Sequence, residues 1–257
     1  MNPFAFVEAD GLKIRYRREG SGPSVLLLHG WGGSIESFEP VYQALRTSFD
    51  AVAIDFPGHG QSTLPPRPWH VADFLDITLE VMDQLAMTQP HIVAHSFGAR
   101  VSIQMAARHR QRAAKMLFAA GAGVAPRKSI SRSLKRKASS IAHTMEAVPV
   151  ARSLVHALRG RLLPRLASRD YRNAGELRQT LSNVIAEDLT PLLSSIRSKC
   201  LLVWGDQDQE TPLYMGETMH RLIPASELVI FPGAGHFPYL DQSNKFNLLM
   251  MRFLREP

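Results

Sequence analysis

The sequence of 257 residues is poor in cysteine and has no long apolar run. Its single cysteine, Cys200, excludes an intrachain disulfide, and its place at the start of an apolar run indicates a small buried residue. No apolar stretch approaches the ~18 residues that a membrane-spanning helix needs. The first six residues lack the basic segment and the long apolar stretch of a secretory signal. We therefore expect a cytoplasmic protein without a transmembrane segment.

Positive charge is concentrated in one segment. The chain carries a net charge of +7, but residues 126–180 hold thirteen Lys and Arg against three Asp and Glu, a net +10 that leaves −3 elsewhere. Such a segment is consistent with a solvated surface, or with docking of an acidic protein or anionic acyl carrier. A single aromatic residue there, Tyr171, argues against nucleic acid, which is bound by several stacking rings. The lack of Trp and Phe also weakens a membrane-surface helix.

Short apolar runs separated by amphipathic stretches predict an α/β fold. Most runs are continuous rather than alternating, as expected for parallel strands covered on both faces. They are residues 24–28, 51–54, 91–94, 115–119, 201–204 and 228–231, after an N-terminal hairpin of residues 4–8 and 13–17. Helical patterns at residues 71–86 and 99–107 lie between strands. The sequence thus predicts a mainly parallel sheet of about eight strands with helices on both faces.

The strand pattern stops between residues 126 and 188, a stretch that is basic and prone to form helices. It separates the strand at residues 115–119 from the strand at residues 201–204. We therefore expect a helical subdomain at residues 126–188, inserted into a core of residues 1–125 and 189–257.

A candidate nucleophile follows one of the strands. Residues 94–98 (Ala-His-Ser-Phe-Gly) join the strand at 91–94 to a helix, and the small flanking residues suit a sharp turn. Such a turn strains the serine backbone and exposes its hydroxyl above the sheet. The alternative is a serine that merely caps the helix. Ser96 is therefore the candidate nucleophile.

A serine hydroxyl needs a base, and the C-terminal region supplies one. His236 follows the last predicted strand on a glycine-rich loop, at the strand edge where sites of parallel sheets form. Asp206 and Asp208 follow the preceding strand, and a carboxylate there can orient the imidazole and stabilise its charged form. The residues alone leave both aspartates open. Either one can instead form a turn or cap a helix.

A glycine-rich loop of residues 29–33 (His-Gly-Trp-Gly-Gly) follows the strand at 24–28. Its glycines let the backbone approach a substrate, so the N–H groups of Trp31 and Phe97 are candidates for an oxyanion hole. The alternative is a simple turn. A phosphate-binding loop is disfavoured because no Gly-Lys-Ser/Thr or GxGxxG pattern is present.

Taken together, the motifs resemble the α/β-hydrolase superfamily. They are residues 29–33, 55–62, 95–98, 205–208 and 235–236, and they cover nearly the whole chain outside the basic segment in the family's order. The resemblance implies an α/β-hydrolase fold with a helical cap at residues 126–188. It also implies that Asp208 is the acid, with Asp206 as second choice, and that residues 55–62 form a structural turn. The family needs no metal and no cofactor.

Within that superfamily, the His-Gly-Trp-Gly loop, the length and the Arg-rich insertion resemble the pimeloyl–acyl-carrier-protein methyl ester carboxylesterases of biotin synthesis. Their cap arginines bind an acidic carrier protein, which implies roles for basic residues of the insertion. The candidates are Arg132, Arg136, Arg152 and Arg159. The chain departs from the usual Gly-x-Ser-x-Gly-Gly by having Ala94 and Ala99. Phe237 after the candidate base argues against carbon–carbon bond hydrolases, which usually have Trp there.

We predict a carboxylic ester hydrolase that forms an acyl-enzyme on a small-molecule ester. The alternatives are a hydrolase of another bond (carbon–carbon, amide or peroxide chemistry) and a non-catalytic ligand-binding protein on the same scaffold. Apolar residues of the insertion are candidates for the acyl pocket: Met145, Val148, Leu154 and Leu158. The sequence does not determine the acyl chain length or the oligomeric state.

Overall fold

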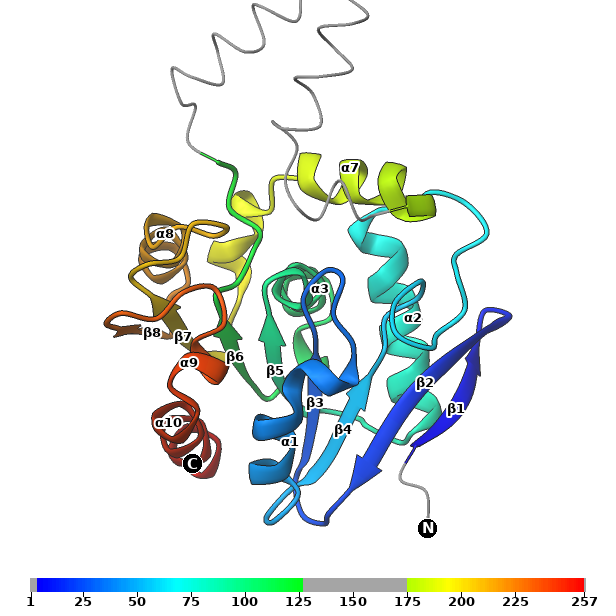
Figure 1. The fold of residues 1–257 in the computed structure, drawn as a ribbon, viewed down its shortest axis with the longest axis horizontal. Helices are drawn as coiled ribbons and strands as arrows, with labels where there is room; N and C mark the ends of the chain where they lie inside the picture. The colour runs from blue at the N-terminus through cyan, green and yellow to red at the C-terminus, as the bar shows by residue number, and fades with distance from the viewer. Residues whose placement is uncertain (1–3, 127–174, 257) are drawn as a thin grey trace, which may run out of the picture. The chain divides into compact units, whose positions relative to one another are not determined.

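The computed structural model of the protein describes residues 4–126 and 175–256. Their strands form one eight-stranded sheet in the order β1-β2-β4-β3-β5-β6-β7-β8 (Figure 1). The strands are β1 (Phe4–Ala9), β2 (Leu12–Glu19), β3 (Ser24–Leu28), β4 (Asp50–Ile54), β5 (His91–His95), β6 (Lys115–Ala119), β7 (Lys199–Gly205) and β8 (Ser226–Phe231). Every strand predicted from the sequence is present, so the α/β prediction is confirmed.

The N-terminal hairpin forms the antiparallel edge of the sheet. β1 pairs with β2 and β2 with β4 in antiparallel fashion, whereas all pairs from β4 to β8 are parallel. Asp10 and Gly11 make the two-residue turn with φ angles of 46° and 74°. Positive φ at both turn positions matches the twist of the two strands, which explains why an Asp-Gly pair joins them.

Helices cover both faces of the sheet, as the continuous apolar strands predict (Figure 1). In β3, Val25 and Leu27 belong to the core beneath α1 and α10, whereas Leu26 and Leu28 belong to the core beneath α2 and α3. The helices are α1 (Glu39–Leu45), α2 (Val71–Gln84), α3 (Phe97–Arg108), α7 (Arg178–Ala186), α8 (Tyr214–Leu222), α9 (Pro238–Asp241) and α10 (Ser243–Arg255). Short 3-10 turns add η1 (Ile35–Phe38), η2 (Arg110–Arg112), η3 (Gly175–Leu177) and η4 (Thr190–Ser195).

The structure refines the bounds of several predicted elements. α3 begins at Phe97, directly after Ser96, rather than at residue 99. β7 and β8 begin two residues earlier than their apolar runs, because flanking polar residues continue the ladder by pairing Cys200 with Ser226. Cys200 is buried, as expected, and burial raises the pKa of its thiol to about 12.

Most of the expected insertion lies outside the described residues. Residue contacts divide the chain into a unit of Met1–Ala125 and Gln179–Pro257 and a unit of Pro126–Arg178. The basic positions proposed for partner binding and the positions proposed for the acyl pocket all fall outside the described ranges: Arg132, Arg136, Arg152, Arg159, Met145, Val148, Leu154 and Leu158. The helical cap at residues 126–188 therefore remains a prediction.

The chain leaves and re-enters the sheet region at neighbouring points. Leu189 N–H donates to Gly123 O over 2.9 Å, and Ala125 N–H donates to the Asp188 carboxylate over 3.3 Å.

None of the described helices is both long and apolar enough to cross a membrane. The cytoplasmic location stays a prediction.

Candidate active site

Ser96 occupies a strained turn between β5 and α3. Its φ of 46° and ψ of −105° lie outside the regions that serine normally adopts. Three backbone hydrogen bonds hold it: Ser96 N–H donates to Ala119 O, and Ser96 O accepts from Ala99 N–H and Ala122 N–H. A Cβ at Gly98 would come within 2.1 Å of Leu28 O, so only glycine lets α3 pack this closely on β3. Ala94 is fully buried, and its methyl group fits where a second glycine is usual.

The glycine-rich loop after β3 runs against this turn. A Cβ at Gly30 would lie 2.5 Å from His95 Nδ1 and 3.4 Å from Ser96 Cβ, so no side chain fits there. The rings of Trp31 and Phe97 meet edge to face with centroids 5.3 Å apart. In the part of the chain described, the backbone N–H groups of both residues lack a protein acceptor. Within these ranges, the two donors predicted from the sequence are thus without a backbone acceptor; Phe97 follows Ser96 directly, and Trp31 follows Gly30, which approaches Ser96.

Asp208 and His236 form a buried hydrogen-bonded pair. His236 Nδ1 lies 2.9 Å from Asp208 Oδ2, and the Asp208 side chain is fully buried. The other oxygen, Oδ1, accepts the N–H groups of Glu210 and Thr211 over 2.9 and 3.0 Å. Burial favours protonation of Asp208, but hydrogen bonds from His236 and Thr211 outweigh it and lower the pKa of this carboxyl. Asp208 is thus an ionised acceptor for the imidazole.

Asp206 faces a different partner. Its Oδ1 accepts the N–H of Gly233 over 2.8 Å, and the residue is exposed. It therefore ties the loop after β7 to the loop after β8 and does not contact the imidazole of His236. The structure thus separates two aspartates that the residues alone left open.

Thr211 belongs to the same cluster, and the sequence analysis did not identify it. Its Oγ1 lies 2.8 Å from Asp208 Oδ2, 3.3 Å from His236 Nδ1 and 3.0 Å from Ala120 O. The spacing of three residues after Asp208 was the available signal, because a hydroxyl there can reach back to the carboxylate.

His95 connects the turn at Ser96 with the loop of His236. Its Nε2 lies 2.9 Å from His236 O, and the two rings have centroids 4.7 Å apart. Burial lowers the pKa of His95 to about 3, so the ring is neutral at physiological pH. Because a carbonyl oxygen only accepts, Nε2 carries the hydrogen and donates it to the loop of the candidate base.

The second imidazole nitrogen of His236 faces a carboxylate. Nε2 lies 3.5 Å from Glu210 Oε2, whose side chain is 58% exposed, while the His236 side chain is 8% exposed. Within the described residues, Ser96 and His236 share no direct hydrogen bond. Hydrogen bonds between catalytic groups often tighten only when substrate is bound, so this separation is compatible with proton transfer.

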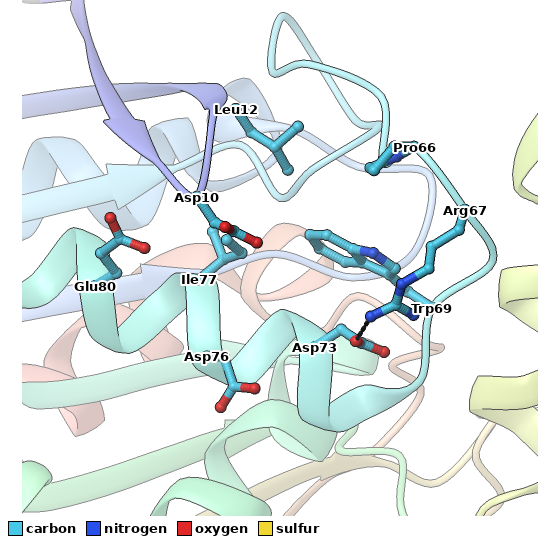
Figure 2. A pocket seen from close by; sticks show the side chains of 9 residues that line it. All are labelled: Asp10, Leu12, Pro66, Arg67, Trp69, Asp73, Asp76, Ile77 and Glu80. Atoms are coloured by element: carbon cyan, nitrogen blue, oxygen red, sulfur yellow. Dashed lines mark hydrogen bonds and ion pairs between the residues drawn. The ribbon is translucent and has the colours of Figure 1, made fainter.

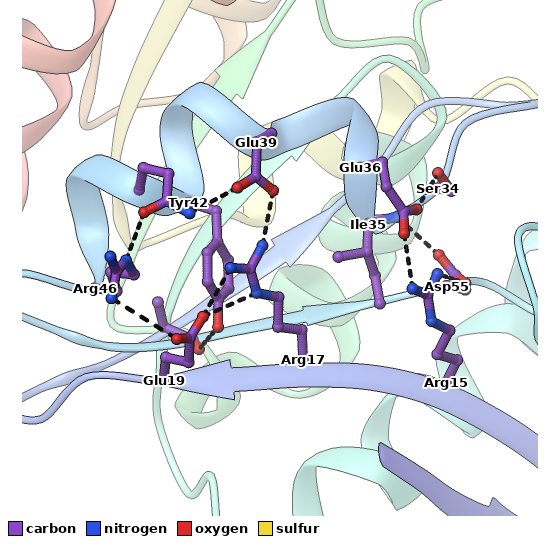
Figure 3. A network of polar contacts seen from close by, with 12 residues as sticks. Arg15, Arg17, Glu19, Ser34, Ile35, Glu36, Glu39, Tyr42, Arg46 and Asp55 are labelled. Carbon is purple, nitrogen blue, oxygen red and sulfur yellow. Dashed lines mark hydrogen bonds and ion pairs between the residues drawn. The ribbon is translucent and has the colours of Figure 1, made fainter. Parts of the chain in front are cut away.

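Asp55, the aspartate after β4, belongs to a network of polar contacts with β2 and η1 (Figure 3). Asp55 is fully buried, and its oxygens accept Ile35 N–H, Gln61 N–H and the Arg15 guanidinium over 2.7, 2.9 and 3.3 Å. Nearby, His29 Nε2 accepts Phe56 N–H over 3.0 Å. These contacts anchor the glycine-rich loop at both of its ends, which gives residues 55–62 the structural role that the resemblance implies.

A cavity of about 280 Å³ lies apart from these residues, at the β1–β2 turn and α2 (Figure 2). Its only cationic side chain, Arg67, is paired with Asp73 over 2.6 Å. The residues that line it are Asp10, Leu12, Pro66, Arg67, Trp69, Asp73, Asp76, Ile77 and Glu80. None of them is a predicted site residue.

In the described ranges, no group of three or more His, Cys, Asp or Glu side chains is arranged to hold a metal ion.

A family model for the alpha/beta hydrolase fold matches residues 23–243. The chain belongs to this family. The match spans every motif named above except the N-terminal hairpin, and it confirms the superfamily that the sequence resembles. The membership and the esterase relatives support a hydrolase.

Two curated relatives and one solved structure resemble the chain over most of its length. The chain is 28% identical to the "dihydrolipoyllysine-residue acetyltransferase component of acetoin cleaving system" of Cupriavidus necator, covering 98% of this chain and 69% of that one. It is also 28% identical to the "pimeloyl-[acyl-carrier protein] methyl ester esterase" of Neisseria meningitidis, covering 90% and 92%. An enol-lactonase from Burkholderia xenovorans LB400 superposes with a TM-score of 0.76 at 20% identity, covering 98% and 100%.

Proposed function

We propose that the protein is a carboxylic ester hydrolase in which Ser96 is the nucleophile, His236 the base and Asp208 the group that orients the base. The observation that carries this proposal is the 2.9 Å contact from His236 Nδ1 to the buried carboxylate of Asp208. With Nδ1–H donated to Asp208, Nε2 holds the lone pair that accepts a proton from serine. The backbone of Ser96 has the strain typical of a nucleophile at a strand–helix turn.

The chemistry follows from these positions. Ser96 Oγ attacks the ester carbonyl while His236 Nε2 takes its proton. The negative oxygen of the tetrahedral intermediate is stabilised by the free N–H groups of Trp31 and Phe97. Nε2–H then protonates the leaving alkoxide as the C–O bond breaks. A water molecule deprotonated by His236 attacks the acyl-enzyme, and Ser96 regains its proton.

The test is hydrolysis of p-nitrophenyl esters, from short to long acyl chains, by the wild type and by Ser96→Ala. We expect the substitution to lower kcat at least about 10³-fold. The acyl chain length that is hydrolysed fastest measures the length of the acyl pocket. Retained activity in Ser96→Ala contradicts the assignment of the nucleophile. A wild type that hydrolyses no ester of any length favours another scissile bond or a binding role.

For the substrate, we propose an acyl methyl ester attached to an acidic carrier protein, such as the pimeloyl-carrier methyl ester of biotin synthesis. Two observations support it: the name of the Neisseria relative and the net +10 of residues 126–180. Opposite charge steers a carrier toward the enzyme.

Charge reversal tests the carrier. Replacing Arg132, Arg136 and Arg159 by Glu is expected to lower kcat/KM about tenfold or more for a carrier-linked methyl ester. Turnover of a small free ester by the same variant is the internal control and is expected to stay unchanged. Equal losses on both substrates contradict a docking role.

A further inference from the structure

A carboxylate lies beside the atom that would pass the proton to the leaving group. Glu210 Oε2 is 3.5 Å from His236 Nε2, on the side of the ring opposite to the Asp208 contact. The Glu210 side chain is 58% exposed, so it lies at the boundary between the site and solvent. Neither the motifs nor the proposed chemistry gives this residue a role.

The position of Glu210 is fixed by the same residue that orients the base. Asp208 Oδ1 accepts Glu210 N–H over 2.9 Å and Thr211 N–H over 3.0 Å, which holds the loop between β7 and α8 in a tight turn. The backbone of Glu210 therefore cannot move without breaking hydrogen bonds to the Asp208 carboxylate.

In the part of the chain that the structure describes, no Lys or Arg pairs with the Glu210 carboxylate. Its carboxylate instead lies 3.5 Å from the Nε2 atom of His236. The other two carboxylates of the loop are engaged: Asp208 by His236, and Asp206 by Gly233 N–H. Within the described ranges, Glu210 thus places a carboxylate without a Lys or Arg partner next to Nε2.

We propose that Glu210 makes the site select esters by the charge of their leaving group, in favour of cationic over anionic alcohols. This inference rests on the proposed ester hydrolysis, in which Nε2–H donates to the leaving oxygen. That oxygen must then lie within hydrogen-bonding distance of Nε2, which places the rest of the leaving alcohol near the Glu210 carboxylate. A positive substituent there is attracted and a negative one is repelled.

The test compares two acetate esters of phenols, one with a meta trimethylammonium group and one with a meta carboxylate. The measured quantity is the ratio of kcat/KM for the cationic ester to that for the anionic ester. Comparing this ratio between variants cancels the intrinsic reactivity of the two esters. We expect Glu210→Gln to lower the ratio about tenfold, because it removes an attraction and a repulsion at once.

Glu227→Gln is the matched control. Glu227 is an exposed carboxylate near the amino end of β8, at the sheet edge opposite to the site. Its replacement by Gln removes the same net charge at a distance from the site. The ratio of kcat/KM for the cationic to the anionic ester is expected to stay within about twofold of the wild type in this variant, because exposed charges beyond a Debye length are screened. Raising the salt to 1 M should lower the wild-type ratio toward that of Glu210→Gln.

The outcomes separate this inference from the proposed function. An unchanged ratio in Glu210→Gln, with both esters still hydrolysed through Ser96, overturns the role of Glu210 and leaves the esterase intact. An equal fall in Glu210→Gln and Glu227→Gln also overturns it, since the effect is then one of net charge. If the wild type hydrolyses neither these esters nor the p-nitrophenyl series, the proposed function fails, and the inference fails with it.

Discussion

Two buried aspartates at the ends of parallel strands have different roles. Each accepts two backbone N–H groups: Asp55, after β4, from Ile35 and Gln61, and Asp208, after β7, from Glu210 and Thr211. They differ in the third partner. Asp55 contacts the Arg15 guanidinium, whereas Asp208 contacts the His236 imidazole. The same residue type, held by two backbone N–H groups in each case, therefore contacts a guanidinium in one place and an imidazole in the other.

The partner decides which role an aspartate takes. A guanidinium stays protonated at any physiological pH, so the contact of Asp55 with Arg15 is permanent and structural. An imidazole gains and loses a proton near neutrality, so a carboxylate beside it orients the ring and stabilises its charged form during proton transfer. The Thr211 hydroxyl also contacts the Asp208 carboxylate. Arg15, the partner of Asp55, also donates a hydrogen bond to Glu36.

The largest expected effect is on turnover. Asp208→Asn should lower kcat about 10³–10⁴-fold, because an amide at this position favours the wrong tautomer of His236. Steady-state hydrolysis of the best p-nitrophenyl ester measures it. Asp206→Asn is the matched control on the same loop, and it keeps the oxygen that accepts Gly233 N–H. If Asp206→Asn is the damaging variant, the acid is misassigned.

The matching change at the other aspartate should act on stability. Asp55→Asn places an amide N–H₂ near donors from Gln61 or Arg15 and leaves the buried guanidinium poorly paired. We expect the free energy of unfolding to fall by about 3 kcal/mol. Urea unfolding followed by circular dichroism measures it. A variant as stable as the wild type would show that Glu36 alone satisfies Arg15.

Thr211→Val should lower kcat about tenfold with little change in KM, because the valine removes a hydrogen bond to the charged carboxylate. Thr211→Ser keeps the hydroxyl and should recover most of the turnover. A loss that appears in KM, or that serine does not rescue, argues for a packing role instead. The same ester assay measures both variants.

The smallest expected effect concerns the exposed partner of Arg15. The hydrogen bond from Arg15 lowers the pKa of Glu36 from 4.5 to about 2. Stabilisation by this carboxylate is therefore present above pH 4.5 and is lost as the pH falls toward 2. Because Glu36 is half exposed, we expect less than about 1 kcal/mol from it. Urea unfolding of wild type and Glu36→Gln at neutral pH and near pH 3 should show a difference that shrinks on acidification.

The sequence by itself determined the order and type of the elements. Short continuous apolar runs such as residues 24–28, alternating with amphipathic stretches, indicate strands buried on both faces, and the small residues around Ser96 permit a sharp strand–helix turn. Local patterns of this kind depend on neighbours along the chain. They predicted the eight-stranded sheet and the positions of Ser96, Trp31 and Phe97 at its carboxyl edge.

Only the tertiary structure decided which side chains meet. Asp206 and Asp208 are two residues apart with the same chemistry, and the turn that places one against His236 and the other against Gly233 depends on how β8 lies beside β7. Glu210 and Thr211 contact Asp208 locally, whereas their approach to His236 depends on the same packing of the strands. Contacts between residues far apart in sequence arise from packing of whole elements, which no local pattern encodes.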